Sequence, residues 1–180
     1  RLQFGVSGVV DSQGRVHIVY SDRRADTPAA TSTLQYMVRE VNGSWSRPEN
    51  VAPSSLAGHQ LSPSLGIDDD DTLYVVWQDQ RRFEEDDRAG SPAYADVFFA
   101  RKPAGEDWTT AIDVNEHTDG EFINRPLLAV DGDRVVVVWS VYLASNLQSA
   151  NRVDWSYLEA GDDDAWAEPV TMIAGRGEAF

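Results

Sequence analysis

Apolar residues along this chain come in short runs, each bounded by Gly, Asp, Asn or Pro. The most apolar runs are "RVHIVY", "TLYVVW" and "RVVVVW", and each ends in an aromatic residue. Runs that are rich in β-branched and aromatic residues and lie between turn-forming residues are typical of β-strands. No segment combines a helical period with capping residues, so the pattern predicts an all-β fold.

One unit occurs three times along the chain. The aromatic residues that end the apolar runs are 57 and 62 residues apart, and a second series of Trp residues has spacings of 63 and 58. An Asp at a tight turn precedes each apolar run. The three series are Tyr20, Trp77 and Trp139; Trp45, Trp108 and Trp166; Asp11, Asp68 and Asp131. They indicate a repeat of about 60 residues.

Each unit contains four strand-like runs, which in the second unit are "PSLGI", "TLYVVW", "DVFFAR" and "WTTAIDV". A repeated unit of four antiparallel strands is typical of a β-propeller, with blades predicted at 1–52, 61–115 and 123–173. The second strand would lie in the middle of its blade and be buried on both faces, which explains its apolar sequence. A β-sandwich with coincidental periodicity is the alternative.

Three blades do not complete a ring, because propellers close with about four to eight. An open blade face would expose apolar side chains and sheet edges, which favours association. We therefore expect either further blades beyond this chain or a second copy, in a ring of six or seven blades. Two copies would supply six.

The charge excludes some classes of partner. Thirty acidic residues against fifteen basic ones give a net charge of −15, which repels nucleic acids and anionic membranes. No run reaches the roughly 18 apolar residues of a membrane span. Cys is absent, so disulfides and thiolate metal sites are excluded. An acidic chain with a single Lys fits an extracellular or cell-surface protein, and equally a saline or high-GC source.

The segments "VVWQDQRR…ADVFFARKPAGEDW" and "RVDWSYLEAGDDDAW" resemble the Asp-box (BNR) repeats of the sialidase-like propeller superfamily. In that family the turn between the third and fourth strands carries Ser-x-Asp-x-Gly-x-x-Trp. The Trp is present in all three units here, with a Gly or Asp before it, but the Ser and Asp do not match. The boxes are therefore degenerate. The positions concerned are Gly43, Gly105 and Asp163, with Trp45, Trp108 and Trp166.

The resemblance implies an extracellular propeller that binds carbohydrate or protein and is non-catalytic as it stands. Two alternatives stay open: an exo-acting glycoside hydrolase of which this chain is a part, and a structural subunit of a surface layer or filament. A sialidase site in this superfamily has an Arg triad, a Tyr–Glu pair and an Asp acid/base. Only "NRP" at 124–126 faintly resembles the Arg-Ile-Pro motif of its first Arg, so no catalytic residue carries over.

Propeller geometry places the long loops after the second strands, and those between blades, on one face, where binding residues concentrate. Arg residues there could hold an anion or sugar hydroxyls through their planar guanidinium groups. Alternatively, each Asp could accept backbone hydrogen bonds and pair with the nearby Arg. The candidates are Asp22, Arg23, Arg24, Asp79, Arg81, Arg82, Arg125 and Tyr142, with His59, His117, Asp119 and Glu121 in the inter-blade loops.

No cofactor or metal is expected from the motifs. The acidic turn "DDDD" could bind Ca²⁺ through Asp68 and Asp70, because Ca²⁺ prefers oxygen ligands. The turn lacks the alternating spacing of a dedicated loop, so a solvated turn is the favoured interpretation. The series His117, Asp119 and Glu121 could be a metal cluster, but it is interpreted as a flexible acidic loop with "TDG" as its turn.

Overall fold

The computed structural model describes residues 2–23, 31–52, 58–81, 95–115, 121–132, 134–143, 151–159 and 165–174. Within these ranges the chain forms β-strands and no α-helix, which confirms the predicted all-β class. The same ranges hold no helix of the length and apolarity needed to cross a membrane.

The strands form three four-stranded antiparallel sheets, in which strands that are consecutive in the chain are neighbours. Blade 1 contains β1 (Leu2–Val10), β2 (Val16–Arg23), β3 (Ser32–Arg39) and β4 (Glu49–Asn50). Blade 2 contains β5 (Gln60–Ile67), β6 (Leu73–Asp79), β7 (Asp96–Lys102) and β8 (Ile112–Asp113). Blade 3 contains β9 (Glu121–Asp131), β10 (Arg134–Leu143), β11 (Arg152–Glu159) and β12 (Val170–Ala174). The three predicted propeller blades are therefore present.

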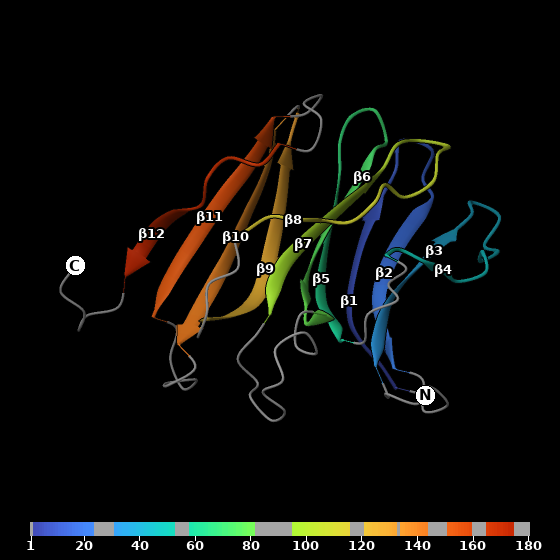
Figure 1. The fold of residues 1–180 in the computed structure, drawn as a ribbon. Helices are drawn as coiled ribbons and strands as arrows, with labels where there is room; N and C mark the ends of the chain where they lie inside the picture. The colour runs from blue at the N-terminus through green and yellow to red at the C-terminus, as the bar shows by residue number, and fades with distance from the viewer. Residues whose placement is uncertain are drawn as a thin grey trace.

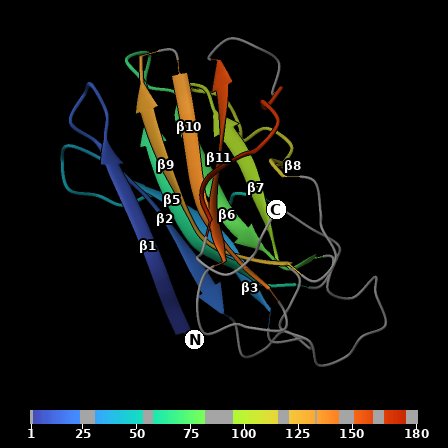
Figure 2. The same cartoon turned by 90° about the vertical axis from the view of Figure 1, so that its left-hand side faces the viewer.

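The blades stand side by side in chain order, with blade 1 and blade 3 at the two ends (Figure 1). Seen from the blade 3 end, they overlap as successive layers (Figure 2). Their first strands are neighbours, because β5 contacts both β1 and β9. Gly66 allows this approach, since a Cβ there would lie 2.6 Å from Cγ2 of Val130 in blade 3.

Blade 2 is buried on both of its faces. One hydrophobic cluster joins it to blade 1 and includes Val19, Tyr36 and Trp77, while the other joins it to blade 3 and includes Phe99 and Trp139. All seven residues of β6 are buried. This confirms why "TLYVVW" is almost entirely apolar: it is the central strand of the central layer.

The fourth strands differ from the prediction. They were expected to begin at the Trp of each unit, but β4, β8 and β12 begin four residues later. Between Trp and strand, a single backbone hydrogen bond reaches the third strand in each blade, donated by Ser46, Thr109 and Ala167. Trp108 and Trp166 instead pack on the preceding blade, and their segments lie outside the regular ladder.

The Asp residues at the tight turns have the same structural role in blades 1 and 2. Oδ1 of Asp11 accepts hydrogen bonds from the backbone N–H groups of Gln13 and Arg15, at 3.0 and 2.8 Å. Oδ1 of Asp68 does the same for Asp70 and Thr72, at 2.9 and 2.8 Å. An Asp side chain that satisfies the backbone of its own turn explains its recurrence in the repeat.

Candidate functional site

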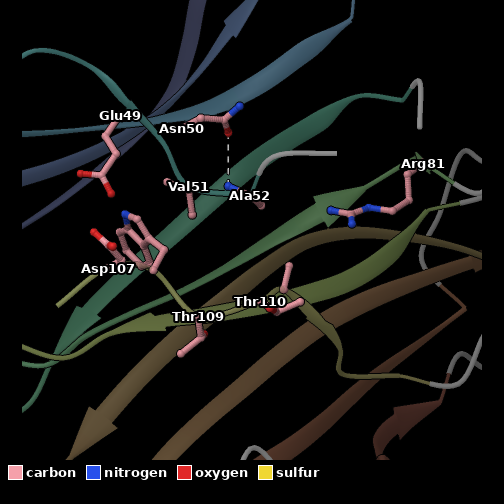
Figure 3. Close-up of a pocket in the computed structure, with 10 residues that line it drawn as sticks. Glu49, Asn50, Val51, Ala52, Arg81, Asp107, Thr109 and Thr110 are labelled. Atoms are coloured by element: carbon pink, nitrogen blue, oxygen red, sulfur yellow. Dashed lines mark hydrogen bonds between the residues drawn. The ribbon is translucent and has the colours of Figure 1, made fainter. Parts of the chain in front are cut away.

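A pocket of about 420 Å³ lies between the outer parts of blades 1 and 2 (Figure 3). Blade 1 contributes β4 and the two residues after it, and blade 2 contributes the segment 107–111 that leads into β8. Arg81, which follows β6, extends into the pocket from the other side. The lining residues are Glu49, Asn50, Val51, Ala52, Arg81, Asp107, Trp108, Thr109, Thr110 and Ala111.

Arg81 is held in place by Asp79 and Phe98. One guanidinium NH₂ group donates to Oδ2 of Asp79 at 2.6 Å, and the Arg81 backbone N–H donates to Oδ1 at 2.9 Å. The guanidinium carbon lies 4.3 Å from the centre of the Phe98 ring, a cation–π contact. The Nε–H of Arg81 is buried and has no hydrogen-bond partner.

Asp79 is a buried positioning residue. Its side chain is 1% exposed, and besides Arg81 it accepts a hydrogen bond from Nε1 of Trp77 at 2.7 Å. Gln60 contributes a longer contact, 3.5 Å from Nε2 to Oδ2. With both oxygens used inside the protein, the carboxylate orients Arg81 and is not itself a ligand-binding group.

Trp108 lines the pocket and carries a second donor without a partner. Its ring packs edge-on against Tyr36 of blade 1, with centroids 5.5 Å apart and planes at 80°. The buried Nε1–H of Trp108 has no hydrogen-bond partner. Buried donors without partners are uncommon in proteins, and each such group calls for an explanation.

The pocket rim carries both signs of charge. Glu49 and Asp107 line it, and Nζ of Lys102 lies 3.4 Å from Glu49 Oε1 and over the rings of Tyr36 and Trp108. Burial, and then the negative charge of Glu49, raises the pKa of Tyr36 to about 12, so its hydroxyl stays protonated. Donors and acceptors therefore line the opening together with the apolar side chains of Val51, Ala52 and Ala111.

The described candidates from blade 1 lie at the end of β2. Asp22 is fully buried at the end of β2, whereas Arg23 is exposed. Close by, Nδ1 of His59 accepts a hydrogen bond from the backbone N–H of Ser32 at 3.1 Å. Burial, and then the charge of Arg23, lowers the pKa of His59. Arg24, Arg82, His117 and Asp119 lie outside the described residues.

Arg125 is exposed and sits at a β-bulge in the first strand of blade 3, with a positive φ of 52°. Gly5 and Ser62 occupy the bulges of the other first strands, with φ of 57° and 51°. A bulge with one left-handed residue is thus a feature of every blade. It turns Arg125 to the surface, apart from the pocket that contains Arg81.

Tyr142 does not join an Arg–Glu group. The guanidinium of Arg152 binds both carboxylate oxygens of Glu121, and its Nε donates to Asp154 at 2.7 Å. Arg152 pairs with Val141, which faces blade 2, so Tyr142 lies on the opposite face of the sheet, where it contacts Phe122. Sequence reasoning missed Arg152, because its partner Glu121 is 31 residues away.

Asp68 is committed to its own turn, since its Oδ2 also accepts a hydrogen bond from the Tyr74 hydroxyl at 2.7 Å. Asp70 donates its backbone N–H to Asp68 and is exposed. The part of the chain that the structure describes contains no group of three or more His, Asp or Glu placed to hold a metal ion.

No protein-family profile matches the chain, and no curated protein matches it. Solved structures do resemble it. An α-L-arabinanase of Penicillium chrysogenum, complexed with arabinobiose, aligns with a TM-score of 0.65 at 10% identity, over 96% of this chain and 50% of that one. The GH93 α-L-arabinofuranosidase of Fusarium graminearum with arabinobiose aligns with a TM-score of 0.60 at 12% identity, over 93% and 49%.

A polysaccharide lyase, an ulvan lyase bound to -[GlcA(1-4)Rha3S]-, aligns with a TM-score of 0.59 at 11% identity, over 95% of this chain and 42% of that one. At these identities the likeness shows the fold alone. The Asp-box relationship stays a prediction. The chain spans about half the length of the first two structures.

Proposed function

We propose that this chain is a carbohydrate-binding portion of an extracellular β-propeller, and that the pocket between blades 1 and 2 binds a neutral oligosaccharide. The observation that carries the proposal is the pair of buried donors without partners, Nε1 of Trp108 and Nε of Arg81, beside the carboxylates of Glu49 and Asp107. A sugar hydroxyl both donates and accepts, so it can satisfy both kinds of group.

A neutral ligand fits the charge of the protein. The net charge of −15 repels uronate-rich or sulfated glycans at long range. The two carboxylates that line the pocket oppose an anion there as well. The arabinobiose complexes of two structural neighbours support a neutral pentose oligosaccharide as the first compound to test.

The test compares Trp108→Phe with Trp166→Phe. Both substitutions keep an aromatic ring between two blades and remove a buried indole N–H that has no partner. Only Trp108 lines the pocket. Loss of one hydrogen bond, worth about 0.5–1.5 kcal/mol, should weaken binding about twofold to tenfold in Trp108→Phe. Trp166→Phe should bind like the wild type.

Affinity would be measured by isothermal titration calorimetry with linear arabino-oligosaccharides, and a glycan array would extend the search to other neutral sugars. Equal losses in the two variants would show that the effect is on packing rather than on the pocket. An array with no neutral glycan bound would rule out the proposal.

Catalysis is the second candidate, because two carboxylic residues line the same pocket. Glycoside hydrolases use a pair of carboxyl groups on either side of the bond that is cleaved. If the chain releases reducing ends from arabinan, and Glu49→Gln and Asp107→Asn each abolish that release while binding persists, the pocket is an active site. If both variants bind and neither the wild type nor the variants cleave, it is a binding site.

A further inference from the structure

The chain makes one kind of blade-to-blade contact twice. Trp108 of blade 2 packs edge-on against Tyr36 of blade 1, and Trp166 of blade 3 packs edge-on against Phe99 of blade 2. The centroid distances are 5.5 and 5.1 Å, and the interplanar angles are 80° and 77°. Each blade therefore presents an aromatic side chain from its third strand to the next blade, and a Trp to the preceding one.

The first strands repeat a second contact. Oγ of Ser7 accepts a hydrogen bond from the backbone N–H of Leu65 at 3.0 Å, and Oγ of Ser64 accepts one from Leu128 at 3.0 Å. In both cases a small side chain of one blade faces a Leu of the next. Leu65 and Leu128 belong to the clusters that these contacts close.

Within the described residues, neither half of the aromatic contact meets another blade at the ends of the array, although Trp155 is partly buried and stacks on Tyr157. Trp45 of blade 1 is 47% exposed, although its equivalents Trp108 and Trp166 are partly buried against a neighbour. In blade 3, Trp155 pairs with Val138 and Val170, the register that Tyr36 and Phe99 have in their own blades. Leu158, three positions further along the same strand, faces blade 2. Because side chains alternate between the two faces of a strand, Trp155 faces away from blade 2.

The first strands are complementary in size at the two ends. Leu127 stands where the other blades have Ser7 and Ser64, and it is 65% exposed. Gly8 stands where the others have Leu65 and Leu128. Inside the chain a small residue meets a Leu, whereas at the ends a Leu would meet a Gly. The exchange preserves the total side-chain volume approximately, which close packing requires.

We infer that a second copy of this chain docks head to tail on the open faces, with Leu127 of one copy over Gly8 of the other and Trp45 over Trp155. The Leu–Gly exchange favours this partner, since one chain carries both complementary halves. Val6 and Val10, which flank Gly8 and are 70% and 59% exposed, would be covered too. Two copies that join at both ends make six blades, within the range of closed propellers.

Light scattering coupled to gel filtration tests the inference on the whole chain, over a range of concentrations. Salt of about 0.5 M is needed to screen the repulsion between two chains of charge −15. The expected mass is about twice the 19.9 kDa of one chain. Trp45→Asp and Leu127→Asp should each raise the dissociation constant at least tenfold. Val41→Asp, which places the same charge at a 68% exposed turn residue, should leave it unchanged.

Mixing the two variants makes the test specific for head-to-tail contact. A mixed pair has one junction free of both substitutions, so an equimolar mixture should contain more dimer than either variant alone. If Leu127→Asp or Trp45→Asp alone dimerises like the wild type, the contact joins like faces and the inference is wrong. A wild-type chain that stays monomeric at about 100 μM, where contacts of even modest affinity are populated, overturns it as well.

Discussion

Asp11→Asn should destabilise the protein far more than the matched change Asp68→Asn. Both residues satisfy the backbone of a tight turn through Oδ1, and these bonds survive in an Asn side chain. The difference lies at Oδ2. In Asp11 it accepts a hydrogen bond from Nε of Arg15 at 2.5 Å and lies 3.0 Å from Nε2 of His17.

The magnitude follows from these partners. A hydrogen bond between charged groups contributes about 1.5–3 kcal/mol, and the side chain of Asp11 is fully buried. An Asn amide would direct its own N–H groups at the Arg15 donor, so the full loss of about 2–3 kcal/mol is expected. Oδ2 of Asp68 meets only the Tyr74 hydroxyl, which can rotate to accept from an amide. Asp68→Asn should therefore cost about 1 kcal/mol or less.

The pH dependence has a definite sign. Burial alone would raise the pKa of Asp11, but hydrogen bonds from His17 and Arg15 outweigh it and hold the pKa well below its ordinary value. A carboxyl group with a lowered pKa in the folded state adds stability above its unfolded pKa, near about 4, and that stability is lost as the pH falls towards the folded value. The difference in the free energy of unfolding between wild type and Asp11→Asn should thus be largest at pH 5–7 and should decrease below about pH 4.

Urea unfolding followed by Trp fluorescence would measure both variants, at neutral pH and at about pH 3. Equal costs for Asp11→Asn and Asp68→Asn would refute the role given to Arg15. If the difference in unfolding free energy between wild type and Asp11→Asn is as large at pH 3 as at neutral pH, Asp11 is not ionised in the folded protein.

Two further substitutions probe the seams between blades and the ion pair of blade 3. Gly66→Ala should destabilise the protein by about 1–3 kcal/mol through overpacking against Val130. Adding Val130→Ala in the same chain should recover part of the lost stability. If it recovers none, the strain does not lie at Val130. Arg152→Gln should cost about 2 kcal/mol in urea unfolding, because Glu121 and Asp154 lose their shared partner in a half-buried site; a cost under about 0.5 kcal/mol would contradict this.

The fold was largely predictable because each blade repeats the same local sequence. Turn residues such as Asp11 act within a few positions, and the central strands require apolar residues on both faces. Both requirements can be recognised from the local sequence. The start of the fourth strands was predicted wrongly for the opposite reason, because Trp108 packs against Tyr36, which lies 72 residues earlier in the chain.

The pocket was not predictable, because it forms where two repeats meet. Glu49 and Thr110 belong to different blades and share no motif, and Trp108 was interpreted as a repeat position, a strand start and an Asp-box remnant. Arg81 was selected by sequence, but for a loop surface rather than for the seam in which it lies. Its pairing with Asp79 was one of the two interpretations left open, and the structure shows that geometry.

The layered arrangement determines how far the effect of a destabilising substitution extends through the molecule. Within the part of the chain that the structure describes, the extensive contacts between blades join blades that are neighbours in the chain. The stability of these three blades is therefore approximately a sum of contributions from each blade and from each contact between neighbouring blades. Blade 2 has two seams, whereas blades 1 and 3 have one each within the chain. A destabilising substitution in β6 therefore weakens both contacts between blades, whereas one in β1 or β12 affects only one end of the described array. Within these three blades, the same substitution is therefore expected to cost more stability in blade 2 than in blade 1 or blade 3.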